Sequence, residues 1–215
     1  MKRGFFITFE GGEGAGKSIQ VEILTSHLNE EGYHLVVTRE PGGTRIGEQI
    51  RSITHDPENV DLNPLAEAYL MSAARAQHVT EIIKPAIDSG KIVVCDRFVD
   101  SSIAYQGCGR KLGSDVIKKL NELAVDGAIP DLTLFLSVSP EIGMRRRGKT
   151  KKKDRLDLQQ QDFYKRVHDG YISIAKENSK RYVLIDASKS IETVATKIWE
   201  VVKQRLNSIP GINRT

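Results

Sequence analysis

The feature that most constrains this chain is a glycine-rich segment close to its start. The letters GGEGAGKS, residues 11–18, follow the apolar run FFITFE. The first glycine and the last three residues of this segment match G-x-x-x-x-G-K-[ST], the phosphate-binding P-loop. Glycines let backbone N–H groups turn toward an anion at the N-terminus of the following helix. The segment therefore predicts a strand, a phosphate-binding turn and a helix, in that order.

The P-loop predicts a nucleotide-binding site, which the family resemblance described below assigns to ATP. We expect it to be lined by Gly11, Gly12, Glu13, Gly14, Ala15, Gly16, Lys17 and Ser18. Lys17 would reach the β- and γ-phosphates, and the Ser18 hydroxyl is placed for Mg²⁺. The chain has no N-K-x-D motif, which argues against a switch GTPase. It has Gly12 and Glu13 where a partition ATPase would carry an early lysine.

Apolar, β-branched runs recur between helical patterns, and they predict the fold class. The runs cover residues 5–10, 34–40, 91–96, 131–138 and 181–186. Consecutive apolar residues are typical of strands buried on both faces of a parallel sheet. Helices are predicted from Lys17 to Glu31, from Asn63-Pro64 to Glu81, from Ser114 to Asp126, and from Ser190 onward. The pattern predicts an α/β fold with a doubly wound, five-stranded parallel sheet and helices on both faces, as one domain over residues 1–215.

Composition limits the partners. A net charge of +4 over 215 residues suits an anionic ligand but is too small to indicate nucleic acid by itself. Cys95 and Cys108 have no metal-binding spacing, and the five histidines are scattered, so neither residue type predicts a metal site. No apolar stretch is as long as a membrane span, and no signal peptide precedes Phe5. We expect a reduced, cytoplasmic protein without a membrane partner.

Two further stretches carry candidate site residues, each with a plainer interpretation. In CDRFVDSSIAYQG, residues 95–107, Asp96 is positioned like a Walker-B acid for Mg²⁺, and Arg97 could bind an acceptor phosphate. Alternatively, Asp96 caps a helix and Arg97 is solvated. Met71 and Arg75 lie one helical turn apart and could cradle a planar base. Core packing with a surface arginine is the usual explanation of such a pair, and it is favoured for this pair taken alone.

Taken together, these stretches resemble thymidylate kinases over almost the whole length. The segments that carry the resemblance are FITFEGGEGAGKS, TREPGGT, AARAQH, IKPAIDSGKIVVCDRF, DSSIAYQG, PDLTLFLSVSPE and DRLD. The resemblance implies a P-loop NTPase fold, phosphorylation of dTMP to dTDP with ATP and Mg²⁺, and a homodimer packed through helices. The bacterial branch is most similar, because Glu13-Gly14-Ala15 contains no arginine. In that branch the catalytic positive charge is implied to come from the lid.

Residue by residue, the resemblance implies a dTMP site made of Glu40, Arg51, Met71, Arg75, Arg97, Ser102, Tyr105 and Gln106. The guanidinium groups of Arg51 and Arg97 would hold the dTMP phosphate. The Arg75 and Gln106 side chains would bond the thymine edge, with Ser102 nearby, and Tyr105 would favour the deoxyribose. Met71 stands where the family usually presents a phenylalanine to the base. A thioether can lie against a ring, but the substitution puts base selectivity in question.

The run RRRGKTKKKDR, residues 145–155, is a charge cluster of a kind that is usually solvated or meets nucleic acid. The resemblance makes it a lid, at about residues 144–158, that brings cations to the transferring phosphoryl group. Arg146 would stack on adenine. Ser188 lies in IDAS, residues 185–188, which resembles the family's loop near that base but could equally be an ordinary strand-to-helix turn. Arg147 and Arg155 compete with Lys149 and Lys151–Lys153 for the catalytic cation. The predicted catalytic set is Lys17, Asp96, Arg97, Arg147 and Arg155.

Two other functions stay open at this point. Met71 makes a kinase for another (deoxy)nucleoside monophosphate conceivable. The lysine-rich run is also compatible with a P-loop ATPase that binds nucleic acid, whereas the kinase interpretation involves small nucleotides and no nucleic acid.

Overall fold

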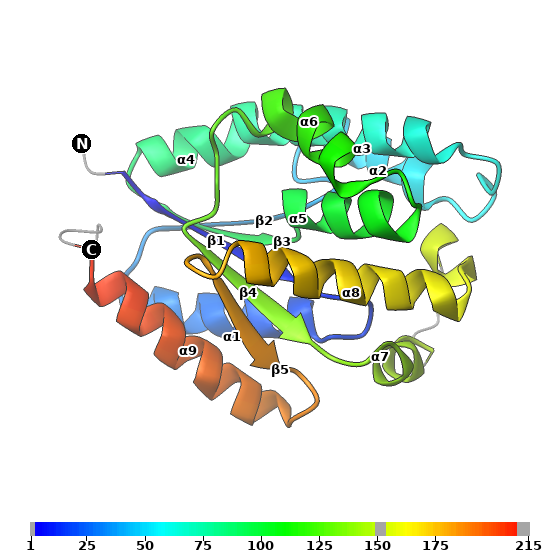
Figure 1. The fold of residues 1–215 in the computed structure, drawn as a ribbon. Helices are drawn as coiled ribbons and strands as arrows, with labels where there is room; N and C mark the ends of the chain where they lie inside the picture. Colours follow the sequence, from blue (N-terminus) through cyan, green and yellow to red (C-terminus); the bar gives the residue numbers. More distant parts are fainter. Residues whose placement is uncertain (1–2, 149–153, 210–215) are drawn as a thin grey trace.

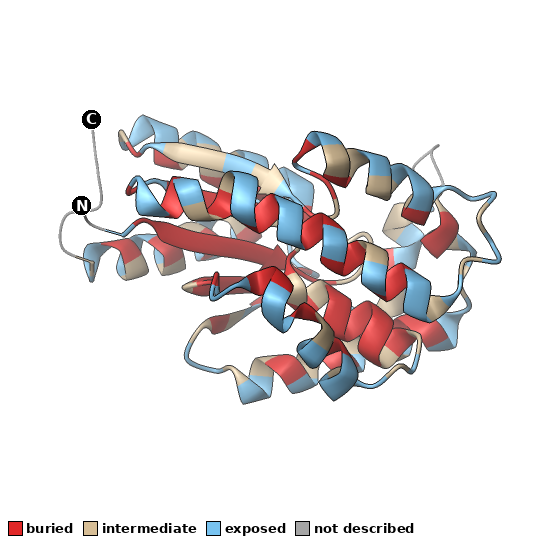
Figure 2. Ribbon diagram, turned by 90° about the horizontal axis from the view of Figure 1, so that it is seen from above, coloured by how far each residue is buried: buried red, intermediate tan, exposed pale blue. Residues whose placement is uncertain are grey.

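The computed structural model describes residues 3–148 and 154–209, and its centre is a five-stranded parallel sheet (Figure 1). The strands are β1 (Phe5–Glu10), β2 (Leu35–Arg39), β3 (Ile92–Asp96), β4 (Leu132–Ser137) and β5 (Tyr182–Asp186). Each of the five predicted runs forms a strand, with ends within one residue of the prediction. The strand order is β2-β3-β1-β4-β5. The central strand β1 is buried along its whole length (Figure 2), which explains its unbroken apolar sequence.

Nine α-helices surround the sheet in the described part of the chain. They are α1 (Lys17–Glu30), α2 (Arg45–His55), α3 (Pro64–His78), α4 (Lys84–Asp88), α5 (Val99–Ser102), α6 (Ser114–Val125), α7 (Pro140–Arg147), α8 (Gln161–Glu177) and α9 (Ile191–Asn207). The predicted starts at Asn63 and Ser190 are correct, because both side chains cap the first turn of their helices.

One predicted helix end is wrong. The helix expected to end at Glu81 leaves α-helical geometry at His78 and continues through a π-helical turn, Val79–Ile83, into α4. The backbone at Val79 stays right-handed, and a proline enters only at position 85, in the first turn of α4. Pro85 has no N–H to donate to the preceding turn, yet the helix continues through it, so this proline does not end the helix where the prediction placed its end.

The two faces of the sheet carry separate apolar cores. Helices α1 and α9 cover one face, where Leu24 and Val202 pack with β-strand residues such as Ile7 and Val94. Helices α3 to α6 and α8 lie over the other face (Figure 1). Tyr171 of α8 stacks there on Phe135 of β4, with ring centroids 5.2 Å apart. The confirmed doubly wound sheet brings the carboxyl ends of β1, β3 and β4 to one edge, where such folds bind ligands.

Candidate active site

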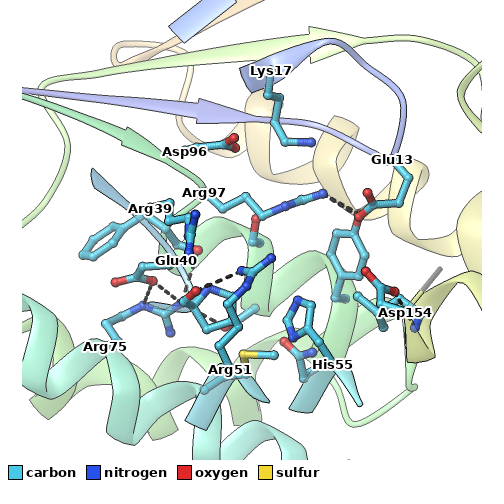
Figure 3. Close-up of a pocket in the computed structure, with 18 of the residues that line it drawn as sticks. Glu13, Lys17, Arg39, Glu40, Arg51, His55, Arg75, Asp96, Arg97 and Asp154 are labelled. Atoms are coloured by element: carbon cyan, nitrogen blue, oxygen red, sulfur yellow. Dashed lines mark hydrogen bonds and ion pairs between the residues drawn. The ribbon is translucent and has the colours of Figure 1, made fainter. Parts of the chain in front are cut away.

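Two cavities meet at the carboxyl edge of the sheet. The larger, about 720 Å³, lies between the P-loop, the start of α1, α7 and residues 187–194. The smaller, about 290 Å³, lies between the P-loop, β2, α2, α3 and the segment after β3 (Figure 3). Four residues line both: Glu13, Lys17, Ser18 and Arg147. The site can therefore hold two ligands that touch at these four residues.

Lys17 lies at the junction of the two cavities and is almost fully buried. Its ammonium group donates to the Gly11 carbonyl oxygen at 3.1 Å and to the Gly12 carbonyl oxygen at 2.9 Å. Burial, together with the charge of Arg97, lowers the pKa of Lys17 to about 8. Within the described residues, the hydrogen bonds of this cation therefore go to neutral carbonyl groups, and its charge is available to a phosphate.

A close backbone approach places the lid helix against the P-loop. Gly14 has a φ of +67°, and a Cβ atom there would lie 2.1 Å from the Gly143 carbonyl oxygen of α7. A Cβ atom on Gly143 would in turn lie 2.4 Å from the Glu13 carbonyl oxygen. Only glycine fits both positions, and their pairing brings Arg146 and Arg147 to the larger cavity.

Ser18 and Asp96 form the corner where a cation would sit. The Ser18 hydroxyl donates to Asp96 Oδ2 at 3.0 Å. Asp96 Oδ1 is buried and has no hydrogen-bond partner within residues 3–148 and 154–209. An orphaned carboxylate oxygen beside a P-loop hydroxyl fits Mg²⁺ that is bound largely through water. The described residues contain no cluster of three or more His, Cys, Asp or Glu side chains of metal-binding geometry.

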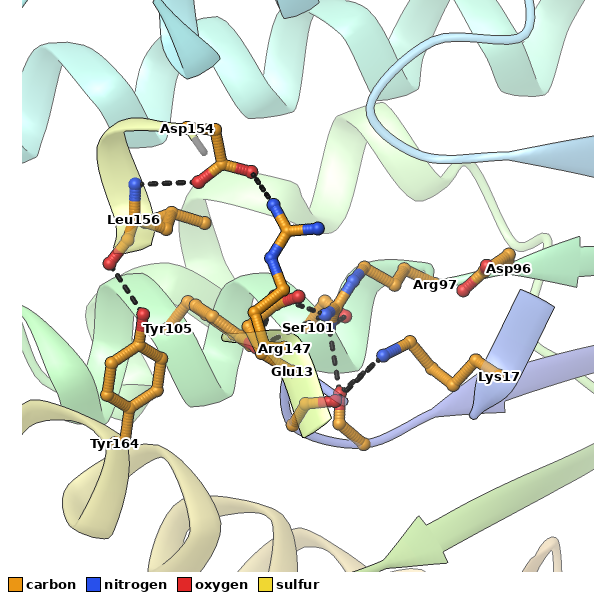
Figure 4. Close-up of polar contacts among 12 residues, drawn as sticks. Glu13, Lys17, Asp96, Arg97, Ser101, Tyr105, Arg147, Asp154, Leu156 and Tyr164 are labelled. Carbon is orange, nitrogen blue, oxygen red and sulfur yellow. Dashed lines mark hydrogen bonds and ion pairs between the residues drawn. The ribbon is translucent and has the colours of Figure 1, made fainter. Parts of the chain in front are cut away.

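Arg97 connects the P-loop to the smaller cavity. Its guanidinium donates to the Gly11 carbonyl oxygen at 2.9 Å and to Glu13 Oε1 at 2.6 Å (Figure 4). It also lies over the Tyr105 ring, 5.0 Å from the centroid. Burial alone would raise the pKa of Glu13, but Arg97 and Lys17 outweigh it and bring the pKa to about 2. Arg97 is therefore not the solvated arginine of the plainer interpretation.

Arg75 forms the far end of the smaller cavity, opposite the P-loop. Only 3% of the residue is exposed. Its Nε donates to Glu40 Oε2 at 2.8 Å (Figure 3). Its Nη2 donates to Ser102 Oγ at 3.1 Å, and Nη1 donates to Asn121 Oδ1. Met71, one turn earlier, lines the same cavity. The alternative of a surface arginine is thus wrong, since Arg75 is buried and held in a fixed orientation.

Comparison with known proteins agrees with this geometry. A family model for thymidylate kinase matches residues 9–198. The chain belongs to the thymidylate kinase family. The thymidylate kinase of Thermoanaerobacter sp. (strain X514) is 46% identical over 204 residues, which cover 95% of this chain and 100% of that protein. That of Geobacillus sp. (strain WCH70) is 47% identical over 194 residues, 89% of this chain and 92% of the relative.

A solved structure is similar over the same extent. The crystal structure of thymidylate kinase from Ehrlichia chaffeensis superposes with a TM-score of 0.75 at 35% identity. The match covers 94% of this chain and 99% of that one. The P-loop NTPase fold predicted from the sequence is therefore confirmed.

The structure brings together most of the residues that the family resemblance named. The predicted dTMP-site residues all line the smaller cavity, and Glu13 to Ser18 all line the larger one. Their individual roles stay predictions. Arg146 also lines the larger cavity and donates to the Ala187 and Ser188 carbonyl oxygens at 2.8 and 3.4 Å. Ser188 itself is not among the residues that line that cavity.

The lid cations differ in position. Arg147 lines both cavities, and its guanidinium is paired with Asp157 at 2.8 Å. It is also paired with Asp154 at 3.2 Å (Figure 4). Arg155 lines neither cavity. It is buried, with Nη2 2.5 Å from Glu67 Oε2 and Nε donating to the Thr54 carbonyl oxygen at 3.0 Å. Lys149 and Lys151–Lys153, the other candidates, lie outside the described residues.

Several lining residues were missed by the sequence reasoning. They are Arg39, Pro41, His55, Phe98, Ser101, Asp154 and Leu156. Most of them fall within or beside segments already quoted for the family resemblance, so that signal could have found them. His55 had no such signal. Burial and the charges of Arg51 and Arg97 lower the pKa of His55 to about 3, so it faces the cavity as a neutral imidazole.

Proposed function

We propose that this protein phosphorylates dTMP to dTDP with ATP and Mg²⁺, a step that supplies dTTP for DNA synthesis. The observation that carries the proposal is the junction of two cavities at the P-loop, one lined by the phosphate loop and the other by arginines. Membership of the thymidylate kinase family supports the choice of substrate. It disfavours both a P-loop ATPase that binds nucleic acid and a kinase for another nucleoside monophosphate.

In the proposed reaction, a phosphate oxygen of dTMP attacks the γ-phosphorus of ATP in line with the departing β-phosphate oxygen. The bond from phosphorus to the new oxygen forms, the bond to the bridging oxygen breaks, and ADP leaves. No covalent enzyme intermediate is needed, because positioning and charge neutralisation supply most of the catalysis. Lys17 meets the γ-phosphate at the junction, while Arg51 and Arg97 hold the attacking phosphate. Arg147 lines both cavities and is placed to stabilise charge on the transferring group.

Mg²⁺ would be held by Ser18 and Asp96, mainly through water. When bound, it neutralises charge on the β- and γ-phosphates. The described side chains contribute the Ser18 hydroxyl and the free Asp96 Oδ1 to this site.

Base selection belongs to the far end of the smaller cavity. Arg75 is fixed by Glu40, Ser102 and Asn121, so its position does not depend on the ligand. A site whose buried polar groups are built for one base edge rejects a base that leaves them unpaired. Met71 supplies the apolar surface beside it.

The test is ADP release measured by a coupled assay with ATP, Mg²⁺ and one candidate acceptor at a time. We expect strong stimulation by dTMP and much weaker stimulation by dUMP, dCMP and AMP. Equal or better turnover of another monophosphate would reassign the acceptor. ATP hydrolysis stimulated only by DNA or RNA would instead establish the nucleic-acid ATPase.

We also propose a cytoplasmic homodimer in which residues 1–215 form one domain. Helices α3 and α6 pack together through Ser72 Oγ and the Leu120 carbonyl oxygen, 3.1 Å apart. Together they expose Leu65, Tyr69, Val116 and Leu123, the last at 91%. A shared apolar face of this kind suits a second copy of the chain. Within the described ranges no helix is both long and apolar enough to cross a membrane. Sedimentation of Leu123→Lys against wild type tests the dimer, which should dissociate.

A further inference from the structure

We propose that Tyr171 of α8 is a positioning residue that holds Arg97 in place for the acceptor phosphate. The inference deepens the proposed function and depends on it, because it concerns how that site binds dTMP. Tyr171 lines neither of the two cavities, so it acts only through Arg97 and its neighbours.

The backbone at Arg97 needs external support. Its φ is +70°, in the left-handed region that non-glycine residues seldom adopt. Such a conformation persists only where the surroundings over-determine it. The Arg97 N–H donates to the Phe9 carbonyl oxygen at 2.9 Å, and the buried Cys95 thiol donates to the Arg97 carbonyl oxygen at 3.0 Å. These bonds fix the backbone at the two ends of the residue, whereas the side chain is held separately by the Gly11 carbonyl oxygen, Glu13 and its other neighbours.

The carboxylate of Glu10, at the end of β1, fixes the turn that follows Arg97. One oxygen accepts the Phe98 N–H at 2.8 Å. The other accepts the Ser101 hydroxyl at 2.6 Å and the Tyr171 hydroxyl at 2.9 Å. Glu10 is fully buried, so these three donors replace water entirely.

The Tyr171 hydroxyl joins this carboxylate to the Arg97 guanidinium. A phenol has one hydrogen to donate and lone pairs to accept. Since the hydrogen goes to Glu10, the oxygen is free to accept from Arg97 Nη1, which lies 3.3 Å away. The ring cannot swing out, because it is fully buried and stacks on Phe135 with planes 24° apart. Tyr171 therefore gives the guanidinium a fixed acceptor at Nη1, the nitrogen that also donates to the Gly11 carbonyl oxygen of the P-loop.

The hydrogen bond between Tyr171 and Glu10 also affects how the site responds to pH. Burial and the charge of Asp100 on α5 raise the pKa of Glu10 to about 7, against the lowering effect of Arg97. Lys17 on α1 and Arg181 before β5 also face Glu10, as do Cys95 on β3 and Tyr182 on β5. A donor to a carboxylate stabilises its charged form. Loss of the Tyr171 hydroxyl should therefore raise the pKa of Glu10 further.

Two buried tyrosines provide a matched test. Tyr171 and Tyr182 both pack against Phe135. The Tyr182 hydroxyl has no hydrogen-bond partner among residues 3–148 and 154–209. We would measure the ADP-release kinetics of Tyr171→Phe and Tyr182→Phe, varying dTMP and ATP separately and repeating the dTMP series across neutral pH.

For Tyr171→Phe we expect the KM for dTMP to rise roughly ten-fold, with the KM for ATP unchanged. The acid limb of kcat/KM for dTMP should move to higher pH. Tyr182→Phe should match wild type in the KM for dTMP, in the KM for ATP and in the position of the acid limb. If Tyr171→Phe does not fold, Ser101→Ala removes another donor to Glu10 and should move the acid limb the same way.

The inference is overturned if Tyr171→Phe keeps the wild-type KM and acid limb, even if its melting temperature falls. An unmoved acid limb in Ser101→Ala overturns it equally. Wild-type protein that shows no dTMP-stimulated ADP release contradicts the proposed function instead, whatever the variants do.

Discussion

At the scale of single residues, the site holds charged side chains in buried positions, where the desolvation penalty for a charge is largest. Lys17 and Arg75 are almost fully buried, and each is fixed by groups of the protein before any nucleotide arrives. Pre-organised charges of this kind need no rearrangement during the reaction. The two residues differ in partners: Lys17 contacts neutral carbonyl groups, whereas Arg75 is paired with a buried carboxylate.

Because of Lys17, ATP binding should weaken at alkaline pH. Its pKa is lowered to about 8 by burial and by Arg97, so in the free enzyme the ammonium loses its proton as pH rises through 8. The attraction for the triphosphate is then lost, and the KM for ATP should rise above that pH. Lys17→Arg keeps its charge there and should flatten the alkaline limb, even if its turnover is lower. An unchanged limb in Lys17→Arg would assign the titration to another group.

Lys17→Ala should lower kcat by about 10²–10³-fold.

Arg75→Ala should raise the KM for dTMP and also destabilise the protein. Glu40 would keep His78 as a partner but lose the guanidinium, and breaking a buried ion pair costs roughly 3–5 kcal/mol. Urea unfolding measures this loss. Arg39→Ala is the control for stability, because the Arg39–Glu48 pair is about half exposed and contributes at most about 1 kcal/mol. An Arg75→Ala protein with unchanged dTMP affinity would remove the base-site assignment.

At the scale of elements, α7 carries the lid arginines and is positioned by one glycine pair. A Cβ atom on Gly143 would lie 2.4 Å from the Glu13 carbonyl oxygen. Gly143→Ala must therefore push α7 away from the P-loop, since the neighbouring atom is backbone. We expect the KM for ATP to rise several-fold with little change in the KM for dTMP. Glu141→Ala, an exposed change on the same helix, is the control. Equal effects of the two substitutions would show that the close approach is not needed for ATP binding.

Arg155 connects the end of the lid to α3, and its partner allows a decisive test of the predicted catalytic role. Arg155 and Glu67 are 4% and 0% exposed, and Glu67 also accepts Gln106 Nε2 at 2.6 Å. If Arg155 anchors the lid, Arg155→Met should destabilise the protein by roughly 3 kcal/mol, and Glu67→Gln/Arg155→Met should recover most of that stability and the kcat. If Arg155 supplies catalytic charge, the double variant will recover stability but stay as slow as Arg155→Met.

The elements also show what the sequence could predict. Strands β1, β3 and β4 are buried runs, whereas the edge strands β2 and β5 are partly exposed, and the predicted ranges of all five agree with the structure within one residue at each end. Helix α8 was missed, although Phe163, Val167, Tyr171 and Ile174 follow a helical period. The arginines of the lid could not be ranked from the sequence. The burial of Arg155 depends on Glu67, 88 positions away, and a charge run carries no period that reveals such a partner.

At the scale of the whole molecule, the sheet determines that the two nucleotide sites share one corner. The carboxyl ends of β1 and β3 lie side by side, with Phe9 opposite Asp96. The P-loop follows β1 in the chain, and Arg97, the arginine proposed to bind the acceptor phosphate, follows β3. Glu13, Lys17, Ser18 and Arg147 consequently line both cavities. Sequence alone could not show this shared corner, because the order of the strands is a tertiary property.

This shared corner predicts that one molecule can fill both cavities. Two nucleosides, adenosine and thymidine, joined through a chain of phosphates should bind more tightly than ATP or dTMP alone. Linking two ligands whose sites are adjacent converts the second binding event into an intramolecular one and raises affinity by about 10²–10⁴-fold. Isothermal titration calorimetry, direct and in competition with each nucleotide, measures the gain.

The linker length gives this prediction its control. A bridge that spans the corner should gain affinity, and a bridge one or two phosphates shorter should fall back to the affinity of a single nucleotide, because its two bases cannot reach both cavities together. Lys17→Ala should weaken the binding of the full-length compound, since Lys17 lines both cavities. The ability of the compound to compete with ATP and with dTMP should fall to the same degree. A full-length compound that competes with only one of the two nucleotides would mean that the cavities cannot be occupied at once. In that case in-line transfer between them could not occur in this arrangement of the chain.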